Sequence, residues 1–273
     1  MKIISPFLSI LLFVSCASGK ENTYTGSTPA DTVIRSFVGI SLSDSVDFIR
    51  WKFILQNNEY QLQCNYGIGK ANTNGFINGG AKIELRGEYK KEKNYYQFQN
   101  GTKTLKALEL NVDLFHLLNT DNSLLVGNGG WSYTLNNIMP SGTDQVSITA
   151  TPIVLKDSIG FEGRTPCKIP GVIAPGSSCY KLKWYIVLYG NTQINKPGSY
   201  KVFGTGWRKE GGRTGRWKII AGKNGRTIYQ LNDEDGNGFL YLLKLDEHVL
   251  VFTDAKGKLL VGDEDFSYTL NSK

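Results

Sequence analysis

The chain is poor in the residues that build metal centres: its 273 residues include only two His, two Met and four Cys. So few imidazole and thioether groups leave little material for a metal site built on His or Met. After the N-terminal segment no run approaches eighteen apolar residues, so we expect no membrane-crossing helix there. Lys and Arg exceed Asp and Glu by 31 to 24, an excess too small to indicate a nucleic-acid-binding protein.

The composition that is present is typical of a folded β-rich protein. Hydrophobic residues make up 40% of the chain and aromatic residues 12%, which excludes a disordered or collagen-like chain. The 31 glycines together with the aromatic residues favour many short strands joined by tight turns.

The N-terminus indicates an exported lipoprotein. Lys2 precedes an apolar run, Ile3 to Val14, that is too short to span a bilayer and ends at Ser15 and Cys16. This ending looks like a bacterial lipobox, so we expect residues 1–15 to be cleaved and Cys16 to be acylated. An ordinary signal peptide with an incidental cysteine is the alternative. The polar residues 16–32 show no hydrophobic period, and we expect them to form a flexible tether.

The rest of the chain contains two copies of one unit. Residues 124–136 and 259–271 align without a gap and are identical at nine of thirteen positions. The openings match more loosely: Phe37-Val38-Gly39 aligns with Phe161-Glu162-Gly163, and residues 51–55 align with residues 184–188. We therefore predict tandem domains at 33–138 and 159–273, joined by a linker over 139–158 that contains Pro140 and Pro152.

Within each copy the hydrophobic period is two. Leu182, Trp184, Ile186 and Leu188 fall on one face of a strand while Lys183 falls on the other. Similar short strands follow at close spacing, separated by glycine-containing turns, and no convincing amphipathic helix interrupts them. This pattern predicts an all-β chain of two small antiparallel barrels, because closure removes the exposed strand edges of an open sandwich.

The motifs of the second copy resemble those of a known lipoprotein family. They run in this order: Gly163-x-x-Pro166-Cys167, a second cysteine at Cys179, an apolar strand, Gly215-x-Trp217, Tyr229-x-Leu231, and a closing Tyr268-x-Leu270. This order is similar to the N-terminal domain of the NlpE family, the copper-resistance or envelope-stress lipoproteins, and to double-copy lipoproteins of the Bacteroidetes. The resemblance covers about residues 161–271, and more weakly 37–136. It implies a lipocalin-like barrel anchored to the outer membrane.

The cysteines depart from the family pattern. The family has a tight Cys-x-x-Cys pair, whereas eleven residues separate Cys167 from Cys179 and the first copy has no such pair. We therefore do not carry a copper function over. In an oxidising envelope, Cys167 and Cys179 are the natural disulfide, with a redox or metal switch as the alternative. Cys64 is interpreted as a buried, inert thiol.

One basic stretch of the second copy is the candidate ligand surface, where cations alternate with tryptophans. Its residues are Lys201, Trp207, Arg208, Arg213, Arg216 and Trp217. Such a surface could bind anionic lipid headgroups, glycans or single-stranded nucleic acid, of which an envelope location disfavours nucleic acid. The alternative is a solvated hairpin with one core tryptophan on each strand.

Two other motifs carry less weight. Asp233-x-Asp235-x-Asn237-Gly238 copies the first half of an EF-hand loop, but Lys244 stands at the twelfth position, so we interpret it as a hairpin turn. His116 and His248 lack an adjacent nucleophile motif.

The sequence therefore favours a non-enzymatic, outer-membrane-anchored lipoprotein with no metal and no cofactor, which binds or senses an envelope partner. The alternatives are a lipocalin-like carrier of a small apolar ligand or lipid and, less favoured, a hydrolase that uses one of the two histidines.

Overall fold

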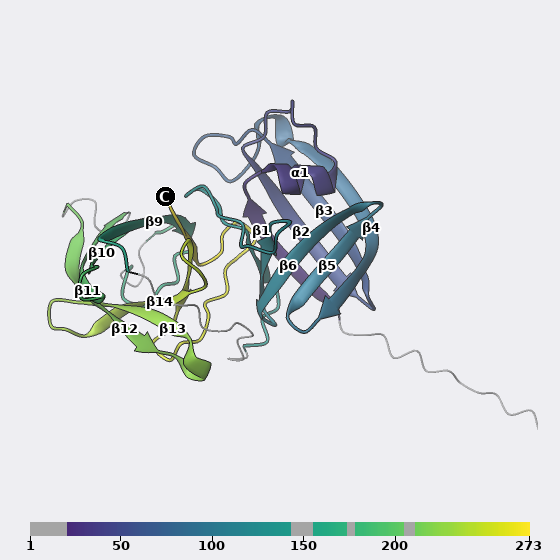
Figure 1. The fold of residues 1–273 in the computed structure, drawn as a ribbon. Helices are drawn as coiled ribbons and strands as arrows, with labels where there is room; N and C mark the ends of the chain where they lie inside the picture. The colour runs from purple at the N-terminus through teal and green to yellow at the C-terminus, as the bar shows by residue number, and fades with distance from the viewer. Residues whose placement is uncertain (1–20, 143–154, 174–177, 205–210) are drawn as a thin grey trace, which may run out of the picture.

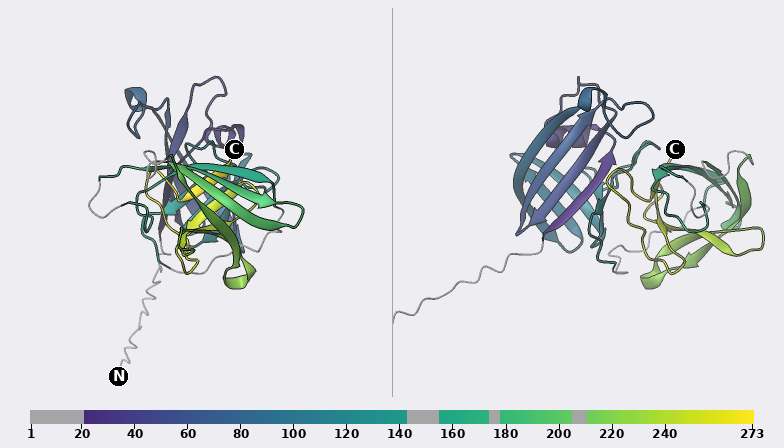
Figure 2. Two further views of the ribbon diagram at one scale, coloured as in Figure 1. Left: turned by 90° about the vertical axis from the view of Figure 1, so that its left-hand side faces the viewer. Right: turned by 180° about the vertical axis from the view of Figure 1, so that it is seen from behind.

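A computed structural model describes residues 21–142, 155–173, 178–204 and 211–273. They form two closed antiparallel barrels of eight strands each, which lie side by side (Figure 1). The predicted all-β fold of two tandem barrels is confirmed. Figure 2 shows the same pair from two further directions, with the yellow C-terminal segment running between the barrels.

Each barrel is a simple meander closed by its first strand. In barrel one β1 pairs with both β2 and β8, and in barrel two β9 pairs with both β10 and β16. The strands of barrel one are β1 (Asn22–Thr28), β2 (Phe48–Gln56), β3 (Glu59–Gly67), β4 (Ala81–Glu92), β5 (Tyr95–Asn100), β6 (Lys103–Asn111), β7 (Leu114–Leu118) and β8 (Thr134–Asn137). Those of barrel two are β9 (Ser158–Thr165), β10 (Leu182–Asn191), β11 (Lys196–Gly204), β12 (Arg213–Ala221), β13 (Thr227–Asn232), β14 (Gly238–Lys244), β15 (Val249–Thr253) and β16 (Thr269–Ser272). Short 3-10 turns cover Ile77–Gly79 and Lys223–Gly225.

The period of two in the sequence places alternate side chains inside each barrel. In β2, Trp51, Phe53 and Leu55 are buried, and Lys52 between them is exposed. The β2–β3 hairpin closes through Asn57 and Asn58, whose φ angles of 51° and 64° suit the primed turns that match the twist of the strands. The alternation therefore sets the face of each strand, and the turn residues set its register.

The expected tether over residues 16–32 is wrong from Asn22 onward, because Asn22–Thr28 is β1. Thr23, Thr25 and Ser27 alternate with inward positions, and these polar residues concealed the strand. The opening of the first copy is therefore Gly26-Ser27-Thr28-Pro29, and the alignment through Phe37-Val38-Gly39 is corrected.

Matching contacts identify this opening as the counterpart of Gly163-Arg164-Thr165-Pro166. The Trp51 indole donates to Thr28 Oγ1 at 2.8 Å, and the Trp184 indole donates to Thr165 Oγ1 at 2.8 Å. Each threonine hydroxyl in turn donates to the carbonyl of the proline that follows it, at 3.0 Å.

The seven-residue helix α1 (Thr32–Val38), which packs at one end of barrel one, was not expected from the sequence. Asp31 caps its first turn by accepting from the Ile34 N–H at 2.9 Å, and Gly39 ends it at a φ of 84°. Ile34, Phe37 and Val38 join the barrel core. No helix in the described part of the chain is long and apolar enough to cross a membrane.

Candidate functional site

The two barrels dock through an apolar cluster that both of them build. Leu110 and Leu114 of barrel one pack in one buried cluster with Leu245 and Val249 of barrel two, together with neighbouring side chains of β13, β14 and β15. In the alignment of the two copies, Leu245 is the equivalent of Leu110 and Val249 is the equivalent of Leu114. Each barrel therefore contributes the same positions of the repeat to the contact.

A polar network beside this cluster pairs equivalent residues directly. The Ser132 and Ser267 hydroxyls lie 2.6 Å apart, and the Thr269 hydroxyl donates to Thr134 Oγ1 at 2.9 Å. Both pairs join residues separated by the repeat offset of 135, and all four side chains are buried. Equivalent residues can meet in this way only close to an axis of approximate twofold symmetry.

Reciprocal hydrogen bonds confirm this pseudo-symmetry. Asn136 Oδ1 accepts from the Gly262 N–H at 2.9 Å, and Asn271 Oδ1 accepts from the Gly127 N–H at 2.8 Å. Both glycines are sterically required, since an added Cβ would lie 2.2 Å from the Trp131 carbonyl oxygen at Gly127 and 2.1 Å from that of Phe266 at Gly262.

The most similar part of the two copies is thus the part with which they contact each other. Residues 124–136 and 259–271 agree at nine of thirteen positions, and the docking contacts use these segments. A self-complementary surface restricts both partners at once, because every residue meets its own counterpart.

Some contacts between the barrels do not follow the pseudo-twofold symmetry. Asn136 Nδ2 donates to the Asp263 carbonyl at 3.1 Å, whereas Asn271 Nδ2 has no partner among the described residues. An ion pair of 2.6 Å joins Arg50 of barrel one to Asp265 of barrel two, and Asn74 donates to the same carboxylate at 2.5 Å.

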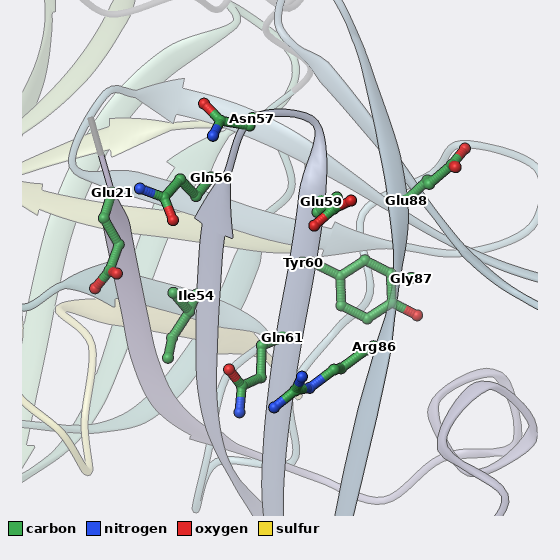
Figure 3. Close-up of a pocket in the computed structure, with 10 residues that line it drawn as sticks. All are labelled: Glu21, Ile54, Gln56, Asn57, Glu59, Tyr60, Gln61, Arg86, Gly87 and Glu88. Carbon is green, nitrogen blue, oxygen red and sulfur yellow. The ribbon is translucent and has the colours of Figure 1, made fainter. Parts of the chain in front are cut away.

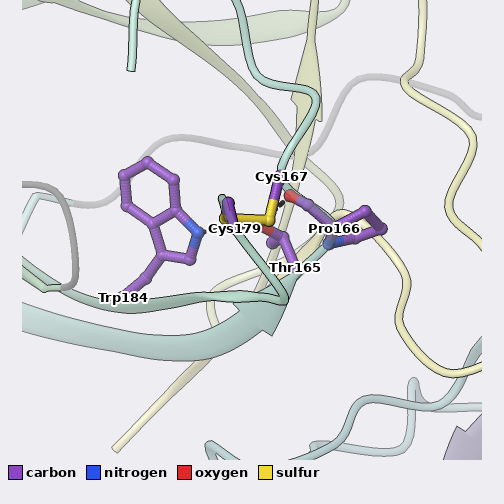
Figure 4. The surroundings of a disulfide bond; sticks show 5 residues. All are labelled: Thr165, Pro166, Cys167, Cys179 and Trp184. Carbon is purple, nitrogen blue, oxygen red and sulfur yellow. Dashed lines mark hydrogen bonds between the residues drawn. A yellow bond between two sulfur atoms is a disulfide. The ribbon is translucent and has the colours of Figure 1, made fainter. Parts of the chain in front are cut away.

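The disulfide predicted between Cys167 and Cys179 is present, with a Cα–Cα distance of 6.0 Å (Figure 4). It closes the loop between β9 and β10, where Trp184 and Thr165 make their hydrogen bond. Ile169 of this loop is buried in the core of barrel two, and Cys179 packs against that core. The disulfide thus holds a loop that contributes apolar side chains to the core.

The four described residues of the candidate ligand surface do not share one face of the barrel. Trp207 and Arg208 lie outside the described residues. Trp217 is buried in the barrel, where its indole donates to the Tyr189 carbonyl at 2.8 Å and its ring meets Tyr229.

The three described cations of this surface also separate. Lys201 lies on the outer face over Phe203, with Nζ 4.7 Å from the ring centre. Arg213 lies over Phe239 at 4.2 Å, on the same side of β12 as Trp217, whereas Arg216 is exposed on the opposite side. Strand parity separates Arg213 from Arg216, because positions that differ by an odd number point to opposite faces of a strand.

Cys64 is a buried thiol on β3, as expected, and burial raises its pKa well above the ordinary value. His116 is fully buried: its Nδ1 lies 2.9 Å from Thr134 Oγ1 and its Nε2 lies 2.8 Å from the Leu125 carbonyl oxygen. Burial lowers the pKa of His116 to about 4, so this imidazole is neutral at pH 7. Both ring nitrogens are engaged by the protein, which indicates a structural role.

His248 is exposed, and its Nδ1 lies 2.7 Å from Ser272 Oγ. The Asp246 carboxylate accepts a hydrogen bond from the backbone N–H of His248 and not from its ring. The Asp233–Gly238 segment forms a turn as expected, with the Asn237 N–H donating to Asp233 Oδ1 at 2.7 Å. Within the described ranges no group of three or more His, Cys, Asp or Glu is placed to hold a metal ion.

A groove of about 470 Å³ lies on barrel one, beside the β2–β3 turn (Figure 3). Glu21, Glu59 and Glu88 line it together with Arg86, whose guanidinium points towards Gln61. Gly87 and Tyr60 both line the groove. The Tyr60 ring packs against Gly87, and a Cβ added at Gly87 would lie 2.9 Å from that ring. Among the described residues, its lining combines carboxylates and amides without a cysteine, serine or histidine.

Sequence reasoning missed the residues that line a second pocket, between the barrels. Arg164, Lys181 and Lys183 of barrel two face Trp131 and Lys70 of barrel one across this cleft. Lys181, just before β10, and Lys183, within it, flank the core residue Leu182 and therefore point away from it. The alternation around Leu182 is visible in the sequence. The residues on the other side of the cleft belong to the first copy, and the sequence does not indicate that the two sets come together.

Comparison of the chain with protein-family models, with curated proteins and with solved structures found no match.

Proposed function

We propose that this protein is a non-enzymatic lipoprotein, anchored to the outer membrane through Cys16, whose paired barrels form an envelope-binding or sensing module of the NlpE-like type. The observation that carries the binding role is the packing of the barrel interiors. In barrel one, the ring of Phe98 lies 4.5 Å from that of Phe53 and 6.2 Å from that of Phe115, among further aromatic rings. Side chains occupy the space that a carrier would reserve for its ligand.

Barrel two is packed in the same manner. Trp184 lies 5.0 Å from Phe252, and Trp217 lies 4.9 Å from Tyr229, within one buried cluster. These filled interiors favour recognition on outer surfaces over a lipocalin-like carrier of an apolar molecule. The lipobox supports the anchor, and the docked interface supports a single two-barrel unit.

Labelling with a palmitate analogue, followed by membrane fractionation, tests the anchor. We expect the wild-type chain to incorporate the label and to sediment with outer membranes, and the Cys16→Ala variant to do neither. Cys64→Ala provides the matched control, because it removes a thiol that is buried in barrel one. Equal labelling and sedimentation of wild type and Cys16→Ala would contradict the lipoprotein assignment.

Crosslinking in intact cells tests the binding role. A photo-crosslinking residue at an exposed position of the outer face, such as Arg216 or Lys218, should capture an envelope component. The same residue introduced at buried Leu231 is the control, because that position faces the core. Capture of nothing from a series of exposed positions would count against a binding module.

A further inference from the structure

A cleft of about 400 Å³ opens between the two barrels, beside the docking interface. Barrel one supplies one wall, with Lys70 in the loop after β3 and Trp131 before β8. Barrel two supplies the other wall, with Arg164 at the end of β9 and Lys181 just before β10. The site therefore exists only when the two barrels are docked, and its volume is in the range of small-molecule sites.

The lining of this cleft is strongly positive. Four cations line it, namely Lys70, Arg164, Lys181 and Lys183, against the single carboxylate of Asp47. Asp47 Oδ2 already accepts from the Gly69 N–H at 2.7 Å and so holds the loop that carries Lys70. Asp265, which lies close by, is paired with Arg50 and Asn74.

Two of the four cations, Arg164 and Lys181, lie against aromatic rings. The Arg164 guanidinium lies 5.2 Å from the centre of the Trp131 ring, so a side chain of barrel two rests on one of barrel one. Lys181 Nζ lies 5.2 Å from the Tyr180 ring and 5.3 Å from the Phe266 ring, and it donates to Asn74 Oδ1 at 3.5 Å. Cation–π contacts fix these groups without neutralising their charge.

The pKa shifts of Arg164 and Lys181 agree with this crowding of cations. Burial lowers the pKa of Arg164. Burial also lowers the pKa of Lys181, and the nearby charges of Arg164 and Lys183 lower it further, whereas the Asp265 carboxylate raises it. The fold thus brings like charges together at some cost, and an anion between them would relieve that cost.

We propose that the cleft binds a phosphate ester carried on a small polar body, such as a glycerol or sugar phosphate. A phosphate monoester carries close to two negative charges and three acceptor oxygens, which suits several converging cations. The guanidinium fork of Arg164 can bind two of these oxygens, and Lys181 supplies a point charge beside it. The aromatic walls suit the glycerol or sugar portion. This inference names a ligand class for the binding module and rests on that proposed function.

The test is titration of the purified full-length protein, in detergent, with glycerol 3-phosphate, with inorganic phosphate, and with glycerophosphoglycerol, the water-soluble headgroup of phosphatidylglycerol. Binding is followed by calorimetry and by intrinsic tryptophan fluorescence, to which Trp131 in the cleft contributes. The variant is Arg164→Gln with Lys181→Gln. The control is Lys90→Gln with Lys103→Gln, which removes the same charge from exposed positions of barrel one.

We expect the cleft variant to weaken binding at least about tenfold and the control variant to leave it within about twofold. Binding of glycerol 3-phosphate identifies a soluble monoester as sufficient, and binding of glycerophosphoglycerol alone identifies a lipid headgroup; either supports the cleft. Equal weakening in both variants, or no binding of any probe by the wild type, overturns the proposal.

Two measurements keep the result interpretable. Thermal unfolding of each variant shows whether it folds, and Arg164→Lys keeps the charge while removing the fork, so it should bind more weakly than wild type but better than the double variant. The outcome is also separate from that of the proposed function. A protein that is acylated at Cys16 and captures an envelope partner but binds no phosphate loses only the cleft inference.

Discussion

The two barrels share a strand plan but close their ends with different devices. At the end of barrel one the chain between β1 and β2 folds into α1, which inserts Ile34, Phe37 and Val38 into the core. At the same point of barrel two, the chain between β9 and β10 is a loop held by the disulfide. Local backbone structure and a covalent link thus perform the same task, so the barrel itself does not dictate how its end is covered.

A second difference lies at the end of β6 and of its counterpart β14. Glu109 of barrel one is buried, accepts a hydrogen bond of 2.8 Å from Tyr96 and pairs with Lys91. Lys244, at the equivalent position of the second copy, is also buried and has the opposite charge. By contrast, the docking segments have kept Ser, Tyr, Thr, Leu and Asn at equivalent positions. At this interior position the two barrels differ in charge, whereas Ser132, Thr134 and Asn136 of the docking surface are identical to their counterparts Ser267, Thr269 and Asn271.

The largest expected effect concerns the device that only barrel two has. Cys167→Ser with Cys179→Ser should lower the free energy of unfolding of barrel two by about 3 kcal/mol, since the disulfide restricts its unfolded chain. Hydrogen exchange resolved by peptide should show faster exchange in β9, β10 and β16 and unchanged exchange in barrel one. The same loss of protection in both barrels would show that their stabilities are not separable.

A smaller expected effect is a pH dependence of stability that His116 gives to barrel one. The pKa of His116 is lowered to about 4 by burial, whereas an unfolded histidine titrates near 6.5. Between these values the unfolded chain binds a proton that the folded chain does not. The free energy of unfolding therefore has its full value above about pH 6.5 and decreases as the pH falls towards 4. The decrease that His116 causes is about 2 kcal/mol at pH 5.

Barrel two supplies the matched substitution for this prediction. Val251 stands at the position equivalent to His116, so His116→Val copies the second barrel into the first. Urea unfolding from pH 8 to pH 5 should show that the difference in stability between wild type and variant changes as the pH falls, with the wild type losing more. A constant difference would mean that His116 is not the titrating group, whatever the absolute stability of the variant.

The smallest expected effect concerns the broken symmetry of the interface. Asn136→Ala and Asn271→Ala each leave a glycine N–H without its acceptor. Asn136 also donates to the Asp263 carbonyl, so its removal should cost about 1 kcal/mol more than removal of Asn271. Chemical denaturation of the two variants measures the difference. Equal losses would mean that the additional amide contact contributes nothing.

Much of the fold could be predicted because its physical signals are local. The alternation from Leu182 to Leu188 placed β10, and the glycines around Asp235 placed the β13–β14 turn. β1 was missed because threonine and serine occupy its outward positions, which makes a strand look like a polar tether. α1 has only seven residues, too few for a helical period to stand out, although Asp31 and Gly39 are ordinary caps.

The candidate site was less predictable because its parts belong to different copies. The strong repeat was visible, but only the folded chain shows that Ser132 meets Ser267 and that the repeat is a contact surface. Arg164 and Trp131 likewise come together only through docking. The spacing of cations and tryptophans suggested that Trp217 belongs to a ligand-binding surface. Its position in the alternation of β12 instead places its ring inside the barrel.

The pairing of equivalent hydroxyls and asparagines also bears on how the molecule assembles. Two separate copies with this self-complementary surface would meet at a rate set by their concentration, and at low concentration they would often be apart. In one chain, the second barrel is always present at the effective concentration that the connecting chain gives. Dilution therefore does not shift the docking of the barrels, and the cleft between them forms at any concentration of the protein.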